Sequence, residues 1–213
     1  MEFPIRPEVT MRLLLVRHGE TADNIARTIG SRPPGPPLSA VGLEQATALA
    51  QVLEDEPVGV VHSSEALRAV QTARTLARAL GVPHREVVEA HEIDAGELEG
   101  LTYAEALPVY MSTMQQWWSD REARIPGGEN GREFLLRFDE AIASVIRGTG
   151  SEETAVVVSH EAAICVWAAN TAENLDAEFS RTHGLRNTGI VALERSHAGG
   201  WTALSWEGHA LER

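Results

Sequence analysis

Residues 12–21 of the chain are Arg-Leu-Leu-Leu-Val-Arg-His-Gly-Glu-Thr, an apolar run that ends in a group of polar and charged side chains. The run is too short for a helix and has no polar face, which is typical of a β-strand buried on both sides of a sheet. Arg17 and His18 follow at the carboxyl end of this predicted strand. Ligands collect at the carboxyl ends of parallel strands, so the stretch indicates a place for a site as well as a fold.

Strands and helices alternate along the rest of the chain. Further short apolar strands are predicted at 58–61, 86–88, 154–158, 190–193 and 201–204, the last two as a hairpin around 198–200. Between them, helices are predicted at 43–53, 66–80, 103–118, 130–145 and 161–169. This alternation favours an α/β fold, a three-layer αβα sandwich with a mostly parallel central sheet. We expect residues 1–10 to be an N-terminal extension and residues 11–213 to form one domain.

Local signals mark several helix ends. Side chains able to cap a helix precede three of the predicted helices: Ser39, Ser63 or Ser64, and Asn130 with Glu133 as a capping box. Pro108 is expected to interrupt the helix at 103–118, because proline lacks the backbone N–H that a helix needs.

Composition excludes several classes of protein. The chain has 213 residues, of which 43% are hydrophobic and 23% charged, as in ordinary globular domains. Its 31 acidic residues outnumber 18 basic ones, giving a net charge of -13 that disfavours nucleic acid and anionic membranes as partners. All the basic residues are arginines, so a Schiff-base or P-loop lysine is excluded. Cys165 stands alone, which excludes an internal disulfide and a cysteine-rich zinc site.

The distribution of apolar residues gives an expectation about location. Apolar runs are only a few residues long, and the N-terminus lacks the apolar segment of a signal peptide. A soluble, cytoplasmic protein is therefore expected. Base rates alone leave open whether it is a monomer or a homodimer.

Residues that can carry chemistry follow four of the predicted strands. They are Arg17, His18 and Asn24 after the first strand, Arg68 after the second, Glu92 after the third, and His160 after the strand at 154–158. In a parallel sheet these points meet at one edge. Guanidinium and imidazole groups suit a phosphoryl group, and a helix N-terminus would add backbone N–H donors to the same anion. Histidine can also accept a phosphoryl group, and a carboxyl group can protonate a leaving oxygen.

Each of these residues alone has an ordinary explanation as a surface or strand-end residue, so the interpretation depends on the joint pattern. The pattern is RHGET at 17–21, SEALRAVQTA at 64–73, EIDAGELEG at 92–100 and VSH at 158–160. With these four blocks the chain resembles the histidine phosphatase superfamily, in its phosphoglycerate mutase-like branch 1. The resemblance extends from about residue 12 to the last strands. It implies a phosphoglycerate mutase-like fold, a small phosphorylated substrate, and no metal or other cofactor.

The resemblance also implies a role for each matching residue. His18 corresponds to the nucleophile that becomes phosphohistidine, and Glu92 to the proton donor. The implied phosphate-binding residues are Arg17, Asn24, Arg68 and His160. The segment at 126–130 resembles the family's GGES segment, with asparagine in place of serine, and 187–188 resembles its late turn. Asp94 and Glu97 are expected to help raise the pKa of the Glu92 carboxyl.

Two departures from the family pattern bear on function. The residue after the second histidine is Glu161, where the family usually has glycine, and we expect its carboxylate to turn away from the phosphate. Phosphoglycerate mutases carry additional basic residues for the substrate carboxylate, whereas residues 101–118 contain none. A phosphatase is therefore preferred over a mutase. A mutase-type phosphotransferase and a non-catalytic domain that binds a phosphorylated ligand are the alternatives.

One segment allows two interpretations. Met111, Met114, Trp117 and Trp118 lie where relatives have a lid over the pocket, and an apolar lid would suit a substrate with a hydrophobic or aromatic part. Ordinary helix packing accounts for the same residues equally well. Cys165 is expected to be a small buried apolar residue, and His183, His197 and His209 are expected at the surface.

Overall fold

The computed structural model describes residues 9–150, 153–196 and 199–212. Its strands form one seven-stranded sheet with the order β3-β2-β4-β1-β5-β6-β7. The strands are β1 (Val9–Arg17), β2 (Val58–Ser63), β3 (His84–Glu86), β4 (Thr154–Ser159), β5 (Ile190–Ser196), β6 (Trp201–Trp206) and β7 (His209–Ala210). The strands β1 to β4 are parallel to one another, and β5, β6 and β7 extend the sheet in antiparallel fashion.

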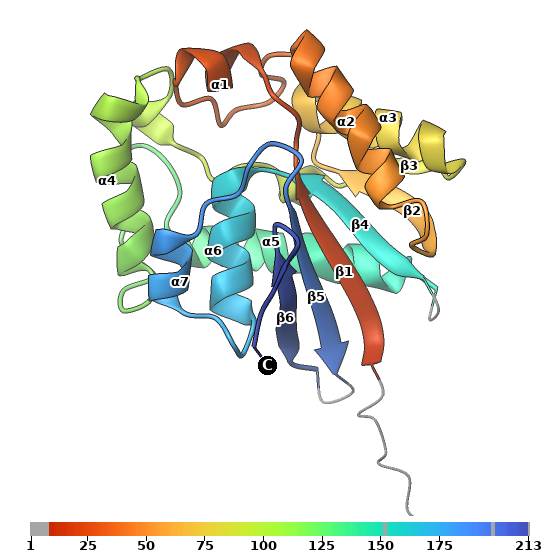
Figure 1. Ribbon diagram of the computed structural model, residues 1–213. Helices are drawn as coiled ribbons and strands as arrows, with labels where there is room; N and C mark the ends of the chain where they lie inside the picture. The colour runs from red at the N-terminus through yellow and green to blue at the C-terminus, as the bar shows by residue number, and fades with distance from the viewer. Residues whose placement is uncertain (1–8, 151–152, 197–198, 213) are drawn as a thin grey trace, which may run out of the picture.

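Helices cover both faces of this sheet (Figure 1). They are α1 (Ala22–Ala26), α2 (Ala40–Val52), α3 (Leu67–Leu80), α4 (Tyr103–Gln116), α5 (Gly131–Arg147), α6 (Glu161–Thr171) and α7 (Ala177–Thr182), with short 3-10 helices η1 (Val88–Ala90) and η2 (Gly96–Leu98). One core lies between the sheet and α2 with α3, and the other between the sheet and α4, α5 and α6. The predicted three-layer sandwich is confirmed. The four strands β3, β2, β4 and β1 form its parallel part.

The strand β1 occupies the middle of the sheet because both of its faces are apolar. Leu13 and Leu15 face the α5 and α6 core, while Leu14 and Val16 face the α2 and α3 core. It pairs with β4 on one side and with β5 on the other. The predicted two-sided strand therefore places the residues that follow Val16 at the centre of one sheet edge.

The helix signals were partly correct. Ser39 caps α2 through its side chain, and Asn130 and Glu133 form the capping box of α5. The prediction for Ser63 or Ser64 was wrong, because α3 has Ala66 at its N-cap and no side-chain cap. The hydroxyl of Ser64 contacts His160 instead.

The predicted interruption at Pro108 was also wrong, since α4 continues through it from Tyr103 to Gln116. Pro108 and Ala104, whose carbonyl loses its helical partner, both lie on the exposed side of the helix, where water can solvate that carbonyl. The buried residues Ala106, Tyr110 and Met114 fix the opposite side.

Two boundaries differ from the sequence expectations. Strand β1 begins at Val9, two residues inside the expected extension, and residues 1–8 lie outside the described part of the chain. Strand β3 covers His84–Glu86 and gives way to a 3-10 turn at Val88. The strands β5 and β6 form the expected antiparallel pair, although residues 197–198 of their connection are outside the described residues. Within the described ranges, none of the helices has the length and apolarity to cross a bilayer.

Candidate active site

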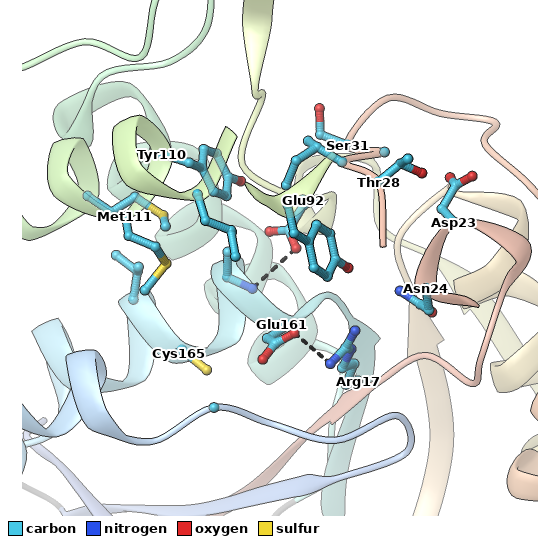
Figure 2. Close-up of a pocket in the computed structure, with 18 of the residues that line it drawn as sticks. Arg17, Asp23, Asn24, Thr28, Ser31, Glu92, Tyr110, Met111, Glu161 and Cys165 are labelled. Atoms are coloured by element: carbon cyan, nitrogen blue, oxygen red, sulfur yellow. Dashed lines mark hydrogen bonds and ion pairs between the residues drawn. The ribbon is translucent and has the colours of Figure 1, made fainter. Parts of the chain in front are cut away.

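The predicted site residues come together at the carboxyl edge of the parallel strands. His18 follows β1, His160 follows β4, and Arg68 lies in the first turn of α3 after β2. A cavity of about 360 Å³ opens at this edge, and its walls include five of the predicted residues: Arg17, His18, Asn24, Arg68 and Glu92. Figure 2 shows Arg17 beside Glu161, Glu92 above Glu161, and Asn24 on α1. His160 is fully buried beside the cavity and is not part of its lining.

The ring of His18 is held in one tautomer. Its Nδ1 lies 2.7 Å from the carbonyl oxygen of Gly19. A carbonyl oxygen only accepts hydrogen bonds, so Nδ1 carries the hydrogen and Nε2 of the neutral ring has a lone pair. Burial lowers the pKa of His18 well below its ordinary value, and the charges of Arg68 and Arg17 lower it further. The neutral ring with an unprotonated Nε2 is therefore the stable form near neutral pH.

Arg68 links the two histidines. Its Nε donates to His18 Nε2 and to His160 Nδ1, both at 3.2 Å, and its Nη2 donates to the carbonyl oxygen of Gly30 at 2.9 Å. Because arginine only donates, His160 Nδ1 accepts, and its Nε2 hydrogen points to Ser64 Oγ at 2.8 Å. The arginine side chain is thus held across the back of the cavity, only 3% exposed.

Glu161 does not turn away from the site, and the expectation that it would was wrong. Its Oε2 lies 2.6 Å from Nη1 of Arg17, and its Oε1 accepts from the backbone N–H of Leu185 at 3.2 Å. The loop at 183–188 supplies this second contact. The sequence around Glu161 does not predict that this loop lies next to the site. Arg17 Nη1 also donates to the carbonyl oxygen of Leu185. Nothing in the described part of the chain accepts from the buried Nε of Arg17.

Asn24 is placed to offer a donor to the cavity. Its Oδ1 accepts from the backbone N–H of Thr21 at 3.1 Å and from Nδ2 of Asn187 at 3.2 Å. The amide oxygen is therefore directed into the protein, and the amide nitrogen is the remaining polar group of this side chain. The predicted late turn contributes directly, because Asn187 Nδ2 also contacts the carbonyl oxygen of His18 at 3.1 Å.

Glu92 occupies the N-terminus of α6. Its carboxylate accepts from the backbone N–H groups of Ile93 at 2.9 Å, Ala163 at 2.8 Å and Ala162 at 3.2 Å. Helix N–H groups were expected to point at a bound anion, but those of Ala162 and Ala163 serve this side chain. Desolvation raises the pKa of Glu92 above its ordinary value, against the opposing effect of these N–H groups. Neither Asp94 nor Glu97, which were expected to contribute, is among the causes of this shift; Asp94 accepts from Gly96 N–H and faces Arg32 at 3.5 Å.

Arg137 is a residue of this site that the sequence did not reveal. From α5 it donates to the carbonyl oxygens of Glu89, His91 and Glu92 at 2.8 to 3.0 Å, and to the carboxylate of Glu129 at 2.5 and 2.7 Å. Glu129 in turn accepts from the backbone N–H of Asp94 at 2.8 Å. This pair anchors the backbone on both sides of Glu92. The family-like segment at 126–130 provided a signal for Glu129, but nothing local connects it to an arginine eight residues later.

In the apolar segment at 111–118, some residues pack in the core and others line the cavity, so each of the two interpretations holds for part of it. Trp117 belongs to the core: it is fully buried, stacks on Phe134, and donates from Nε1 to the carbonyl oxygen of Ala123. Met111 and Met114 line the cavity. Cys165 is 6% exposed, as expected for a small apolar residue, and also forms part of the wall.

The described residues contain no group of three or more histidine, cysteine, aspartate or glutamate side chains arranged to hold a metal ion. The cations of the site are guanidinium groups. The fold and these groups define an α/β protein with a cavity at the carboxyl edge of its parallel strands, lined by two arginines and a histidine.

Residues 13–208 match the family model of the histidine phosphatase superfamily (branch 1), and the chain belongs to that superfamily. It is 30% identical over 198 residues to a probable phosphoglycerate mutase GpmB of Yersinia pestis, covering 92% of this chain and 90% of the relative. It is 31% identical to the PE-PGRS family protein PE_PGRS11 of Mycobacterium tuberculosis, over 91% of this chain. The chain spans only 36% of the length of that second relative.

Solved structures with the same fold include two kinds of phosphatase. A mycobacterial glucosyl-3-phosphoglycerate phosphatase in complex with VO3 has a TM-score of 0.78 and 25% identity, covering 94% of this chain and 100% of its own. A putative alpha-ribazole-5'-P phosphatase from Escherichia coli has a TM-score of 0.74 and 26% identity, covering 96% of this chain and 99% of its own.

Proposed function

We propose that the protein is a phosphomonoesterase of the histidine acid phosphatase type, which hydrolyses a phosphate monoester through a phosphohistidine on His18. The observation that carries this proposal is the state of that ring. Nδ1 is bonded to Gly19, and the unprotonated Nε2 faces a cavity that also contains Arg17 and Arg68. A neutral imidazole beside two guanidinium groups can attack phosphorus while the arginines neutralise the phosphoryl oxygens.

In the first step, Nε2 of His18 forms a bond to phosphorus and the bond from phosphorus to the ester oxygen breaks. The protonated carboxyl of Glu92 gives its proton to the departing oxygen, so the alcohol leaves neutral and Glu92 becomes a carboxylate. The Nδ1 hydrogen remains on the ring and continues to donate to Gly19. The phosphohistidine therefore keeps the orientation that the free histidine has.

In the second step, the Glu92 carboxylate takes a proton from water, whose oxygen bonds to phosphorus as the bond to Nε2 breaks. Inorganic phosphate leaves, and both His18 and Glu92 return to their starting protonation. Arg17, Arg68 and the amide nitrogen of Asn24 hold the phosphoryl oxygens throughout, which makes positioning and charge stabilisation the main sources of catalysis. His160 contributes by fixing Nε of Arg68.

The composition of α4 supports a phosphatase over a mutase. The helix and its flanks, residues 101–118, contain no basic residue, and this helix forms a wall of the cavity. A mutase needs cations beyond the phosphate site to hold a second anionic group of its substrate. The phosphatases among the related structures agree with this preference.

The proposal is tested by phosphate release from p-nitrophenyl phosphate. The wild-type protein is expected to release phosphate and His18→Ala to release none, while His209→Ala, at an exposed histidine in β7, keeps full activity. Conversion of 3-phosphoglycerate to its isomer, with or without a bisphosphoglycerate primer, would instead show a mutase. Binding of phosphate without any turnover would show a non-catalytic domain.

A further inference from the structure

The part of the cavity beyond the arginines has two walls rich in apolar side chains, although Tyr103 and Gln115 of α4 also line it. One wall comes from α4, with Leu107, Met111 and Met114, and the other from α6, with Ala162, Cys165 and Val166. Aliphatic and thioether side chains of this kind pack against apolar or aromatic groups and offer no hydrogen bond to sugar hydroxyls. In Figure 2 Met111 and Cys165 lie on the same side of the cavity, away from Asn24.

The cations in the rest of the lining are already engaged. Of the described residues that line the cavity, Arg181 and His183 are the positively charged or titratable bases outside the Arg17, Arg68 and His18 group. Arg181 is paired with Glu178, with Nε 2.9 Å from its carboxylate. The ring of His183 is stacked on Phe179, with 3.9 Å between the ring centroids. A second anion on a substrate would therefore have to compete with Glu178 for Arg181.

Negative charge is present in the same region. The Glu161 side chain is 41% exposed, and its carboxylate lies in the cavity wall at the start of α6, on the same helix as Ala162 and Cys165. Asp23 lies in the wall on the α1 side. Glu161 also pairs with Arg17 and offsets part of its charge, so a second anionic group of a substrate near α6 would meet this carboxylate.

We propose that the physiological substrate is a phosphate monoester of an uncharged alcohol or phenol with an apolar or aromatic body, and that Glu161 is the residue that rejects esters with a second anionic group. This inference rests on the proposed phosphatase function. An apolar leaving group fills the space between α4 and α6, whereas a carboxylate there loses its hydration beside Glu161 and finds no free cation.

The test uses two esters of nearly equal shape, 4-carbamoylbenzyl phosphate and 4-carboxybenzyl phosphate. Wild-type protein is expected to favour the uncharged amide by about tenfold or more in kcat/KM, the size of effect that a like charge produces at this range in a partly solvated site. In Glu161→Gln the preference is expected to fall below about threefold, because the amide removes the charge while its single oxygen keeps one of the two contacts, to Arg17 or to the backbone N–H of Leu185. Glu140→Gln, an exposed position on α5, is the matched control and keeps the wild-type ratio.

The ratio is internal to each variant, so a change in folded fraction does not affect it. Equal rates on the two esters in the wild type, or an unchanged ratio in Glu161→Gln, would overturn the inference while leaving the phosphatase intact. If the wild type releases phosphate from neither ester nor from p-nitrophenyl phosphate, the proposed function itself fails and the inference with it.

Discussion

The carboxyl of Glu92 has the environment of a group that gives and takes a proton. It is withdrawn from solvent, which raises its pKa, and three backbone N–H groups fix its orientation. Replacement by glutamine keeps the shape and removes the proton. Because a poor leaving group needs that proton in the first step and a nitrophenolate does not, we expect Glu92→Gln to lose about 10² to 10⁴-fold in kcat/KM on alkyl phosphates and about tenfold or less on p-nitrophenyl phosphate.

Turnover of both substrates by wild type and Glu92→Gln measures this difference. The matched control is Glu97→Gln, an exposed acid of the same segment, which is expected to lose nothing on either substrate. Equal losses on alkyl and aryl substrates would remove Glu92 from the role of proton donor.

The pH dependence follows from two opposite pKa shifts. The reaction needs His18 unprotonated and Glu92 protonated, yet the ordinary pKa of histidine, 6.5, lies above that of glutamate, 4.5. Unshifted, the pair would carry the required protons in only a small fraction of molecules at any pH. Burial lowers the pKa of His18 and raises the pKa of Glu92, so the productive fraction grows.

We therefore expect kcat/KM on an alkyl phosphate to be highest between the two pKa values, to fall as the pH drops through the lowered pKa of His18, and to fall as the pH rises through the raised pKa of Glu92. The fall at higher pH is expected to disappear in Glu92→Gln. A pH profile measured from pH 4 to 9 checks both limbs, at roughly the range over which such groups titrate. Activity that increases in proportion to hydroxide through the ordinary histidine range would contradict the assignment.

At the level of elements, Arg137 connects α5 to the backbone around Glu92. Both it and Glu129 are largely buried, with side chains 10% and 13% exposed. We expect Arg137→Met to lower the free energy of unfolding by about 3 to 5 kcal/mol, because it leaves Glu129 and three carbonyl oxygens without their donor. Arg132 lies on the same helix as Arg137 and forms an exposed pair with Glu122. Arg132→Met breaks this pair and is expected to lower the free energy of unfolding by less than about 1 kcal/mol.

Denaturant unfolding measures the stability of both variants, and a second readout separates stability from positioning. The double variant Glu129→Leu with Arg137→Met is expected to recover part of the stability. Its loss of activity should remain larger on alkyl than on aryl phosphates, because Glu92 is no longer anchored. A uniform loss on both substrates would mean that Arg137 has a structural role only.

The elements also show how far the sequence could be used. The buried strand β1, the Ser39 cap and the Asn130 capping box were predictable because each depends on residues adjacent in the chain. Ser64 was assigned to the wrong partner because its hydroxyl bonds to His160, which lies 96 positions away. Pro108 was misjudged because the side of α4 that tolerates it is set by tertiary packing.

The site followed the same rule. The motif residues were brought together as expected, since a parallel sheet with a known strand order fixes where their strands end. The direction of Glu161 and the contribution of Arg137 were not available, because each depends on a contact with a remote segment, the 183–188 loop in one case and the 89–92 backbone in the other.

For the molecule as a whole, the positive charge at the site comes from the protein itself. The net charge of -13 makes the surface acidic, while Arg17 and Arg68 create a local positive potential in the cavity. Guanidinium groups can neutralise a phosphoryl group without a divalent ion. We expect extensive dialysis against EDTA to leave kcat and KM on p-nitrophenyl phosphate unchanged, and activity restored by Mg²⁺ or Zn²⁺ after such dialysis would contradict this.

The central place of β1 in the sheet makes the strand that carries His18 more stable against local opening than the α4 wall of the cavity. Hydrogen-bonded on both edges and covered on both faces, the strand that presents His18 can open only when the whole domain unfolds. The helix α4, which forms one wall of the cavity, packs on the core with one side and exposes its other side to solvent. If the proposed function holds, mutations on that exposed side can accumulate without disturbing His18, so the alcohol that is recognised can change while the reaction is retained.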